Sequence, residues 1–149
     1  MSEGAEISVT ITQQRDYRFL IDFGETIPQL LADEPAPIGS GQGPSPDQLL
    51  LAAVANCMSA SLFFALKKFK QDAGGIRTTA SARVGRNAEN RLRIQEIALT
   101  IRLGKPGDTI ERLDRILAQF EDFCTVSQSV RRGIPLAVAV EDGRGARLK

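Results

Sequence analysis

Polar and apolar residues alternate along 6–12 (EISVTIT) and again along 18–23 (RFLIDF). A period of two is typical of a half-buried β-strand, so these runs predict a β-hairpin with Arg15 at or near its turn. Two more strands are predicted at 76–87 and 91–104, joined by a turn around 87–90, and a last strand at 134–140.

The pattern changes to a helical one at Ser45. Ser45, Pro46 and Gln48 have the form of an N-cap, a first-turn proline and a capping box, and Gly74-Gly75 predicts the end of the helix. The segment predicts one helix of more than twenty residues. A second helix is predicted at 108–123, where apolar residues recur at steps of three and four.

No charge falls between Leu49 and Leu66, so the long helix could by length cross a membrane. Asn56, Ser59 and Ser61 count against that interpretation, and the rest of the chain alternates like a sheet protein. We therefore expect a fully buried central helix. Because such a helix needs cover on every side, sheets on one face and a second copy of the helix on the other would satisfy it, which predicts a dimer.

The length of 149 residues fits a single domain, 1–149, and the order of elements predicts an α+β fold. Residues 33–46 contain four of the seven prolines and three glycines, which predicts a well-defined surface loop. Residues 141–149 are expected to form a flexible tail.

Charge and composition exclude several classes of function. With 19 Lys and Arg against 18 Asp and Glu, the chain predicts no nucleic-acid partner and no anionic membrane surface. The first ten residues lack the basic and apolar regions of an export signal, so we expect a cytoplasmic protein. The absence of histidine excludes Ser-His and Cys-His pairs and metal sites containing histidine.

Two cysteines, Cys57 and Cys124, are too few for a four-cysteine zinc site. One interpretation treats both as small buried hydrophobic residues. The polar neighbours of Cys57, Asn56 and Ser59, favour a chemical role instead. Cys124 precedes a run of Ser and Thr residues and is expected at the start of a new helix, where amide dipoles stabilise a thiolate.

The segments GPSPDQLLLAAVANCMSASL and FEDFCTVSQSVRRGIPLAV resemble the OsmC/Ohr family of osmotically inducible and organic-hydroperoxide-resistance proteins. The order of the predicted elements agrees over nearly the whole chain, and the DEPAPIGSGQGPSP loop is more similar to the OsmC-like redox branch. This resemblance implies antiparallel sheets wrapped around a long buried helix, in an intertwined homodimer with active sites at the subunit interface.

The resemblance also implies a thiol peroxidase that prefers organic hydroperoxides to hydrogen peroxide. In that reaction Cys57 would form a sulfenic acid and Cys124 would close a disulfide with it. The family's arginine would be Arg15, with Arg18 as the second choice. Its acidic partner would be Asp47, one methylene shorter than the family's usual glutamate.

Chemistry supports those roles, because a thiolate needs a fixed cation beside it and arginine is always charged. Read without the family, Arg15 is a solvated turn charge, and Asp47 can equally serve the helix dipole. We expect no metal or organic cofactor, only an external thiol or dithiol reductant. The alternative is a non-catalytic protein of the same fold that binds a small ligand or senses redox state.

Overall fold

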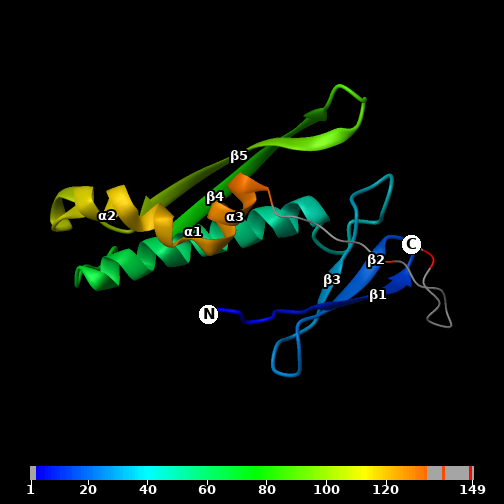
Figure 1. Ribbon diagram of the computed structural model, residues 1–149, viewed down its shortest axis with the longest axis horizontal. Helices are drawn as coiled ribbons and strands as arrows, with labels where there is room; N and C mark the ends of the chain where they lie inside the picture. Colours follow the sequence, from blue (N-terminus) through cyan, green and yellow to red (C-terminus); the bar gives the residue numbers. More distant parts are fainter. Residues whose placement is uncertain (1–2, 134–138, 140–147, 149) are drawn as a thin grey trace. The chain divides into compact units, whose positions relative to one another are not determined.

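The computed structural model describes residues 3–133, 139 and 148 (Figure 1). The described chain has an α+β architecture with antiparallel strands and one long helix, as the sequence predicts. It divides into two compact units, Met1–Ala55 with Thr78–Thr100, and Asn56–Arg77 with Ile101–Lys149. The long helix and the two longest strands continue from one unit into the other.

The first unit contains a three-stranded sheet in the order β1-β2-β3. Strand β1 (Thr10–Arg15) pairs antiparallel with β2 (Arg18–Asp22), and β2 pairs antiparallel with β3 (Leu30–Ala32). The predicted strand at 6–12 is wrong in its bounds, because β2 ends at Asp22, opposite Thr10, and within 3–133 no strand pairs with residues 6–9. Strand β3 was not predicted, since three residues are too few to show a period.

The loop after β3 is ordered by one carboxylate. Asp33 is buried and accepts a hydrogen bond from the amide of Glu34 (2.8 Å), two from Ser40 (amide 3.2 Å, hydroxyl 2.7 Å) and one from the amide of Gln42 (3.0 Å). A side chain at Gly39 would collide with the backbone of Glu34, so the loop closes tightly around the carboxylate. This agrees with the predicted well-defined loop at 33–46.

Helix α1 (Pro46–Lys68) begins where the capping box predicts. The Ser45 amide donates to the Gln48 side chain (3.0 Å), and the Gln48 amide donates to the Ser45 hydroxyl group (3.3 Å). The helix ends before the predicted Gly74-Gly75 stop. Lys70 adopts a left-handed conformation (φ 56°), and the amide of Gln71 bonds back to the carbonyl of Leu66 (2.9 Å), which closes the last turn.

One face of α1 is buried and the other is exposed. The buried residues follow a helical stripe: Val54, Met58, Ser61, Leu62, Ala65 and Leu66. On the opposite face Phe63 is 57% exposed and Phe64 is 55% exposed. The face that carries Phe63 and Phe64 is the one that the expected second copy of the helix would cover. Helix α1 is also long and apolar enough to cross a membrane, a test that the core helices of water-soluble proteins pass as well.

Strands β4 (Ile76–Arg86) and β5 (Leu92–Leu103) form a two-stranded sheet, as predicted. Their connecting turn is closed by a hydrogen bond from the amide of Asn87 to the carbonyl of Arg91 (2.9 Å). Asn90 takes a left-handed conformation there (φ 61°), which asparagine tolerates well.

The core of the second unit joins α1 to the segment after β5. Its buried residues are Leu62, Ala65, Leu66, Ala73, Ile110 and Ile116. The predicted single helix at 108–123 is wrong. The segment is instead a 3₁₀ turn, η1 (Gly107–Thr109), helix α2 (Leu113–Gln119) and a second 3₁₀ turn, η2 (Phe120–Phe123).

The break before α2 lies at Arg112, which has a left-handed conformation (φ 57°). Beside it, the amide of Glu111 donates to the side chain of Gln71 (2.9 Å) instead of continuing a helix. Helix α3 (Thr125–Arg132) follows η2 directly. Two predictions lie outside the described residues. They are the strand at 134–140, of which only Ala139 is described, and the tail at 141–149, of which only Leu148 is described.

Substitutions at two neighbouring residues of α2, one buried and one exposed, can test which side of the helix faces the core. Ile116 is 0% exposed, whereas Leu117 is 47% exposed. We expect Ile116→Ala to lower the free energy of unfolding by about 2–5 kcal/mol, because it removes buried methyl groups and leaves a cavity. Leu117→Ala is the matched control and should cost less than about 1 kcal/mol. Urea titrations measure both, and equal losses would contradict the described packing.

Candidate functional site

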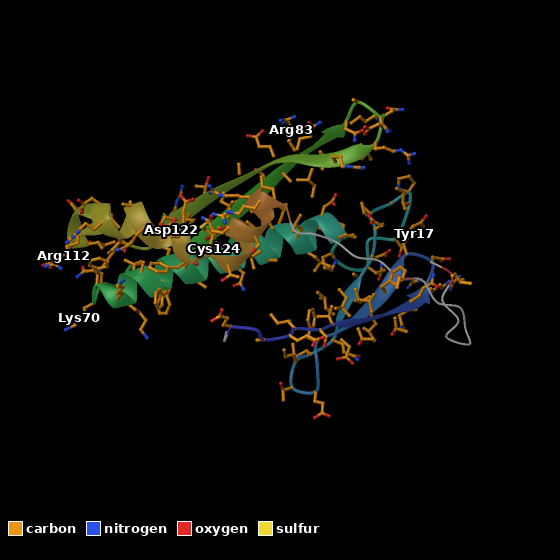
Figure 2. The ribbon with its side chains drawn as sticks, viewed as in Figure 1. Tyr17, Lys70, Arg83, Arg112, Asp122 and Cys124 are labelled. Carbon is orange, nitrogen blue, oxygen red and sulfur yellow. The ribbon has the colours of Figure 1, made fainter. Side chains whose placement is uncertain are left out.

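The two cysteines lie together in the second unit. Cys57 is in α1, and Cys124 is the N-cap residue of α3, as the sequence predicts. Their side chains are hydrogen-bonded to each other, and both are free thiols. Figure 2 shows Cys124 where α3 begins, alongside α1. The side chain of Cys124 is completely buried, whereas that of Cys57 is half-buried.

Hydrogen-bond donors surround both sulfur atoms. The Sγ atom of Cys124 accepts a hydrogen bond from the amide of Ser127 (3.4 Å), the contact that caps α3. The hydroxyl group of Ser127 donates to the backbone carbonyl of Cys124 (3.5 Å). The backbone of Val126 and the side chain of Ser61 act in the same sense on the pKa of Cys57, which they lower. Such donors stabilise a negative charge on sulfur.

These contacts move the two thiol pKa values in opposite directions. Burial raises the pKa of the Cys57 thiol, the amide of Val126 works against that rise, and Cys124 raises the pKa further. Burial opposes ionisation of Cys124 too, but hydrogen bonds from Ser127, Cys57 and Ser61 outweigh it and lower the pKa of Cys124. The pair therefore loses its first proton more readily than its second, and one proton remains between the two sulfurs.

Aromatic and basic side chains of α1 form a cluster with Phe123, the residue directly before Cys124. The rings of Phe64 and Phe123 meet edge to face with centroids 5.3 Å apart. The ammonium group of Lys68 lies 5.5 Å from the centroid of the Phe123 ring, and that of Lys67 lies 5.8 Å from the Phe63 ring. Phe123 directly precedes Cys124, so this cluster joins the surface of α1 to the segment that carries the buried thiol.

The other predicted site residues lie in the first unit. Arg15 ends β1, and Arg18 opens β2 opposite it. Arg15 is exposed and forms an ion pair with Asp16 (3.5 Å). Asp47 lies in the first turn of α1, where its charge favours the helix dipole, and it forms no ion pair with any described residue. These three residues belong to the first unit, and the two cysteines belong to the second.

Two neighbouring cavities occur in the first unit. A polar cavity of about 450 Å³ is lined by both arginines, by Asp33 and by the loop residues Ile38, Gly39 and Ser40. An apolar cavity of about 220 Å³ lies between β1, β2 and the start of α1. Its apolar lining includes Ile11, Phe19, Ile21, Ala32 and Leu49. Tyr17 and Asp33 line both cavities.

Three of the donors to sulfur were not predicted. The amide of Val126 and the amide of Ser127 depend on how α3 approaches α1, which the sequence does not specify. Ser61 could have been found, because it lies four residues after Cys57 and thus on the same face of one helix. Asn56, whose polarity favoured a chemical role for Cys57, is exposed.

The sequence profile of the family described as OsmC-like protein matches residues 39–139. The chain therefore belongs to the OsmC-like protein family, and the matched range includes both cysteines and Asp47. Arg15 and Arg18 lie before it. No curated protein matches the chain by sequence.

Solved structures share the fold at low identity. A putative osmotic stress induced and detoxification response protein from Psychrobacter arcticus has a TM-score of 0.70 and 19% identity, over 86% of this chain and 90% of the other. The organic hydroperoxide resistance protein OsmC from Legionella pneumophila has a TM-score of 0.65 and 16% identity, over 85% and 91%. The organic hydroperoxide resistance protein OhrB of Bacillus subtilis has a TM-score of 0.63 and 16% identity, over 84% and 91%.

The loop that lines the polar cavity has a testable dependence on pH. Hydrogen bonds from the amide of Gln42 and from Ser40 and Glu34 outweigh the effect of burial and lower the pKa of Asp33 from 3.8 to about 2. Ionised Asp33 thus contributes stability that is fully present above pH 3.8 and is lost as the pH falls toward about 2.

We expect Asp33→Asn to lower the thermal midpoint of unfolding at neutral pH, because the amide group cannot accept all of these bonds. The difference from the wild type should shrink as the pH falls from 3.8 to about 2, where the wild-type carboxyl is protonated too. Circular dichroism melts over a pH series measure this, with the exposed Asp16→Asn as control. A difference that stays constant with pH would contradict the assignment.

Proposed function

We propose that the protein is a cysteine-based peroxidase that reduces organic hydroperoxides and, more weakly, hydrogen peroxide. The observation that carries this proposal is the meeting of Cys57 and Cys124, remote in sequence, in one buried hydrogen-bonded pair. Membership of the OsmC-like family supports it, and so does the name of hydroperoxide resistance protein borne by structures with the same fold.

Exposure and charge support separate roles for the two thiols. Cys57 is the peroxidatic thiol, because Cys57 is half-buried and Cys124 is not exposed at all. In the singly ionised pair, transfer of the shared proton to Cys124 leaves the thiolate on Cys57. That thiolate attacks a peroxide oxygen, so the S–O bond forms, the O–O bond breaks and an alkoxide leaves.

The remaining steps balance without any further group. The alkoxide takes the proton of Cys124 and departs as an alcohol. The Cys124 thiolate then attacks the sulfenic acid of Cys57, which forms the disulfide and releases hydroxide. Two electrons pass from the sulfurs to the peroxide, so the reaction needs no metal or organic cofactor. An external thiol or dithiol reduces the disulfide, as the cytoplasm can supply.

A guanidinium group completes the proposed site. Arg15 is the first choice, with Arg18 as the second, and Asp47 is its carboxylate partner. The cation would favour ionisation of Cys57, which the burial of this thiol and its contact with Cys124 oppose. It would also stabilise the negative charge on the departing alkoxide.

We also propose a homodimer, because the exposed side of α1 carries Phe63 and Phe64, which a second copy of this chain would cover.

A second candidate function rests on the apolar cavity of about 220 Å³ in the first unit. A non-catalytic protein of this fold would bind a small apolar ligand there, and its cysteines would be passive or would only sense redox state. The cavity is large enough for a small aromatic or short-chain molecule. The fate of the thiols under peroxide distinguishes the two functions.

The first test follows the thiols directly. Reduced protein mixed with one equivalent of cumene hydroperoxide should consume the peroxide and lose two hydrogen atoms by intact mass, as an intramolecular disulfide forms. Cys57→Ser should abolish peroxide consumption. Cys124→Ser should trap a sulfenic acid on Cys57 that dimedone labels. Two thiols that remain reduced after prolonged exposure would exclude the peroxidase and leave ligand binding.

The second test separates the two arginines, which lie opposite each other in the hairpin. We expect Arg15→Gln to lower kcat/KM for cumene hydroperoxide by roughly 100-fold, the cost of removing one donor that stabilises a transition-state anion. Arg18→Gln is the matched control, with the same change of charge, and should retain most of the activity. The reverse result would transfer the role to Arg18, and two active variants would remove arginine from the mechanism.

A further inference from the structure

Cys124 lies at a joint between two short helical elements. The 3₁₀ turn η2, of four residues, ends at Phe123, and helix α3, of eight residues, begins at Thr125. Elements this short are not stable by themselves, because a helix of fewer than about twelve residues is marginal in water. The direction of the buried Cys124 side chain therefore depends on what fixes η2 and α3 relative to each other.

Gln128 joins the two elements across this joint. Its backbone amide donates to the carbonyl oxygen of Cys124 (3.1 Å). Its side-chain amide donates to the carbonyl oxygen of Glu121 in η2 (3.2 Å). The backbone amide of Cys124 donates to that same oxygen of Glu121 (3.1 Å). Gln128 thus holds the backbone on both sides of the cysteine.

A second contact spans the same joint, the ion pair between Arg131 and Glu121 (2.7 Å). Its side chains are 61% and 46% exposed, and exposed ion pairs contribute little because water and salt screen them. The hydrogen bond from the Gln128 side chain is partly buried and joins two neutral groups, so salt does not screen it. Of the two contacts, we expect the one from Gln128 to decide the position of Cys124.

The η2 side of the joint is anchored on α1. The ring of Phe123 packs edge to face against the ring of Phe64, with centroids 5.3 Å apart. Phe64 lies two helical turns after Cys57 in α1. Because Gln128 ties α3 to this anchored turn, it fixes how the sulfur of Cys124 meets that of Cys57.

A purely structural role of Gln128 is the competing interpretation, since a tethered α3 is also a more stable one. The two roles differ in the chemical step that they affect. Attack on the peroxide belongs to Cys57, in α1, whereas closure of the disulfide needs Cys124 in place. A disulfide has narrow geometric limits, with Cα atoms within about 7 Å of each other. Loss of position therefore slows closure alone, and loss of stability impairs both steps.

We propose that Gln128 is a positioning residue for disulfide closure, an inference that rests on the proposed peroxidase. By holding η2 and α3 in one arrangement, Gln128 directs the Cys124 thiolate at the sulfenic acid of Cys57. The S–S bond then forms, the S–O bond breaks and hydroxide leaves. Gln128 is neither oxidised nor deprotonated in this step.

The test uses full-length Gln128→Ala and Gln128→Glu. The glutamate side chain has nearly the same shape but no N–H group, so it separates the hydrogen bond from packing. Gln119→Ala in α2 is the matched control, because the Gln119 side chain makes no hydrogen bond with a described residue. Thermal melts first establish that each variant is folded. Single-turnover reactions with cumene hydroperoxide then measure sulfenic acid formation and disulfide closure separately.

We expect both Gln128 variants to slow disulfide closure by about three- to tenfold, the worth of one neutral hydrogen bond, while sulfenic acid formation on Cys57 keeps its rate. The longer-lived sulfenic acid should be oxidised further by excess peroxide, which intact mass detects as sulfinic acid. Gln119→Ala should resemble the wild type. Equal slowing of both steps, or closure as fast as in the wild type, overturns the inference.

An equilibrium with glutathione tests the position of Cys124 without any peroxide. At a fixed ratio of oxidised to reduced glutathione, both Gln128 variants should have a ratio of disulfide to dithiol about three- to tenfold lower than the wild type, because their thiols meet less often. An unchanged ratio overturns the inference. A wild type that consumes no hydroperoxide overturns the proposed function instead, and the glutathione equilibrium still decides whether Gln128 positions Cys124.

Discussion

The chemistry proposed for this chain depends on one contact, the hydrogen bond between the thiols of Cys57 and Cys124. It joins the middle of the longest helix to the first residue of α3, two elements that are remote in sequence. Neither thiol has its ordinary tendency to ionise there. The contact lowers the pKa of Cys124 and raises that of Cys57, so the pair loses its first proton more readily than its second and avoids burying two charges together.

The surroundings of the pair follow from that charge. Cys124 occupies an N-cap position, where sulfur accepts the amide of Ser127 in place of the usual oxygen. This hydrogen bond caps α3 and also stabilises a negative charge on the sulfur of Cys124, so the fold and the ionisation of the thiol favour the same position of Cys124. Cys57 has less support, because its burial and its partner both oppose its charge. In the proposed function, attack by Cys57 therefore calls for a cation beside its sulfur.

The first unit supplies a different kind of order. Asp33 binds the loop that follows β3 through backbone amides and one hydroxyl group, and it remains ionised at any physiological pH. That loop forms a wall of the cavity that both candidate arginines line. The loop that Asp33 orders therefore helps to shape the cavity in which either guanidinium group lies.

The sequence by itself determined the α+β class, the hairpin that carries Arg15, the capped start of α1 and the placement of Cys124 at a helix N-terminus, because each depends on local periodicity or a capping motif. It did not determine where α1 or β1 ends, or that 108–123 is broken at Arg112. Those limits depend on pairing partners and on left-handed residues that no local pattern marks. Only the tertiary structure brought the sulfurs together, since contacts between remote segments are decided by packing and not by the residues beside them.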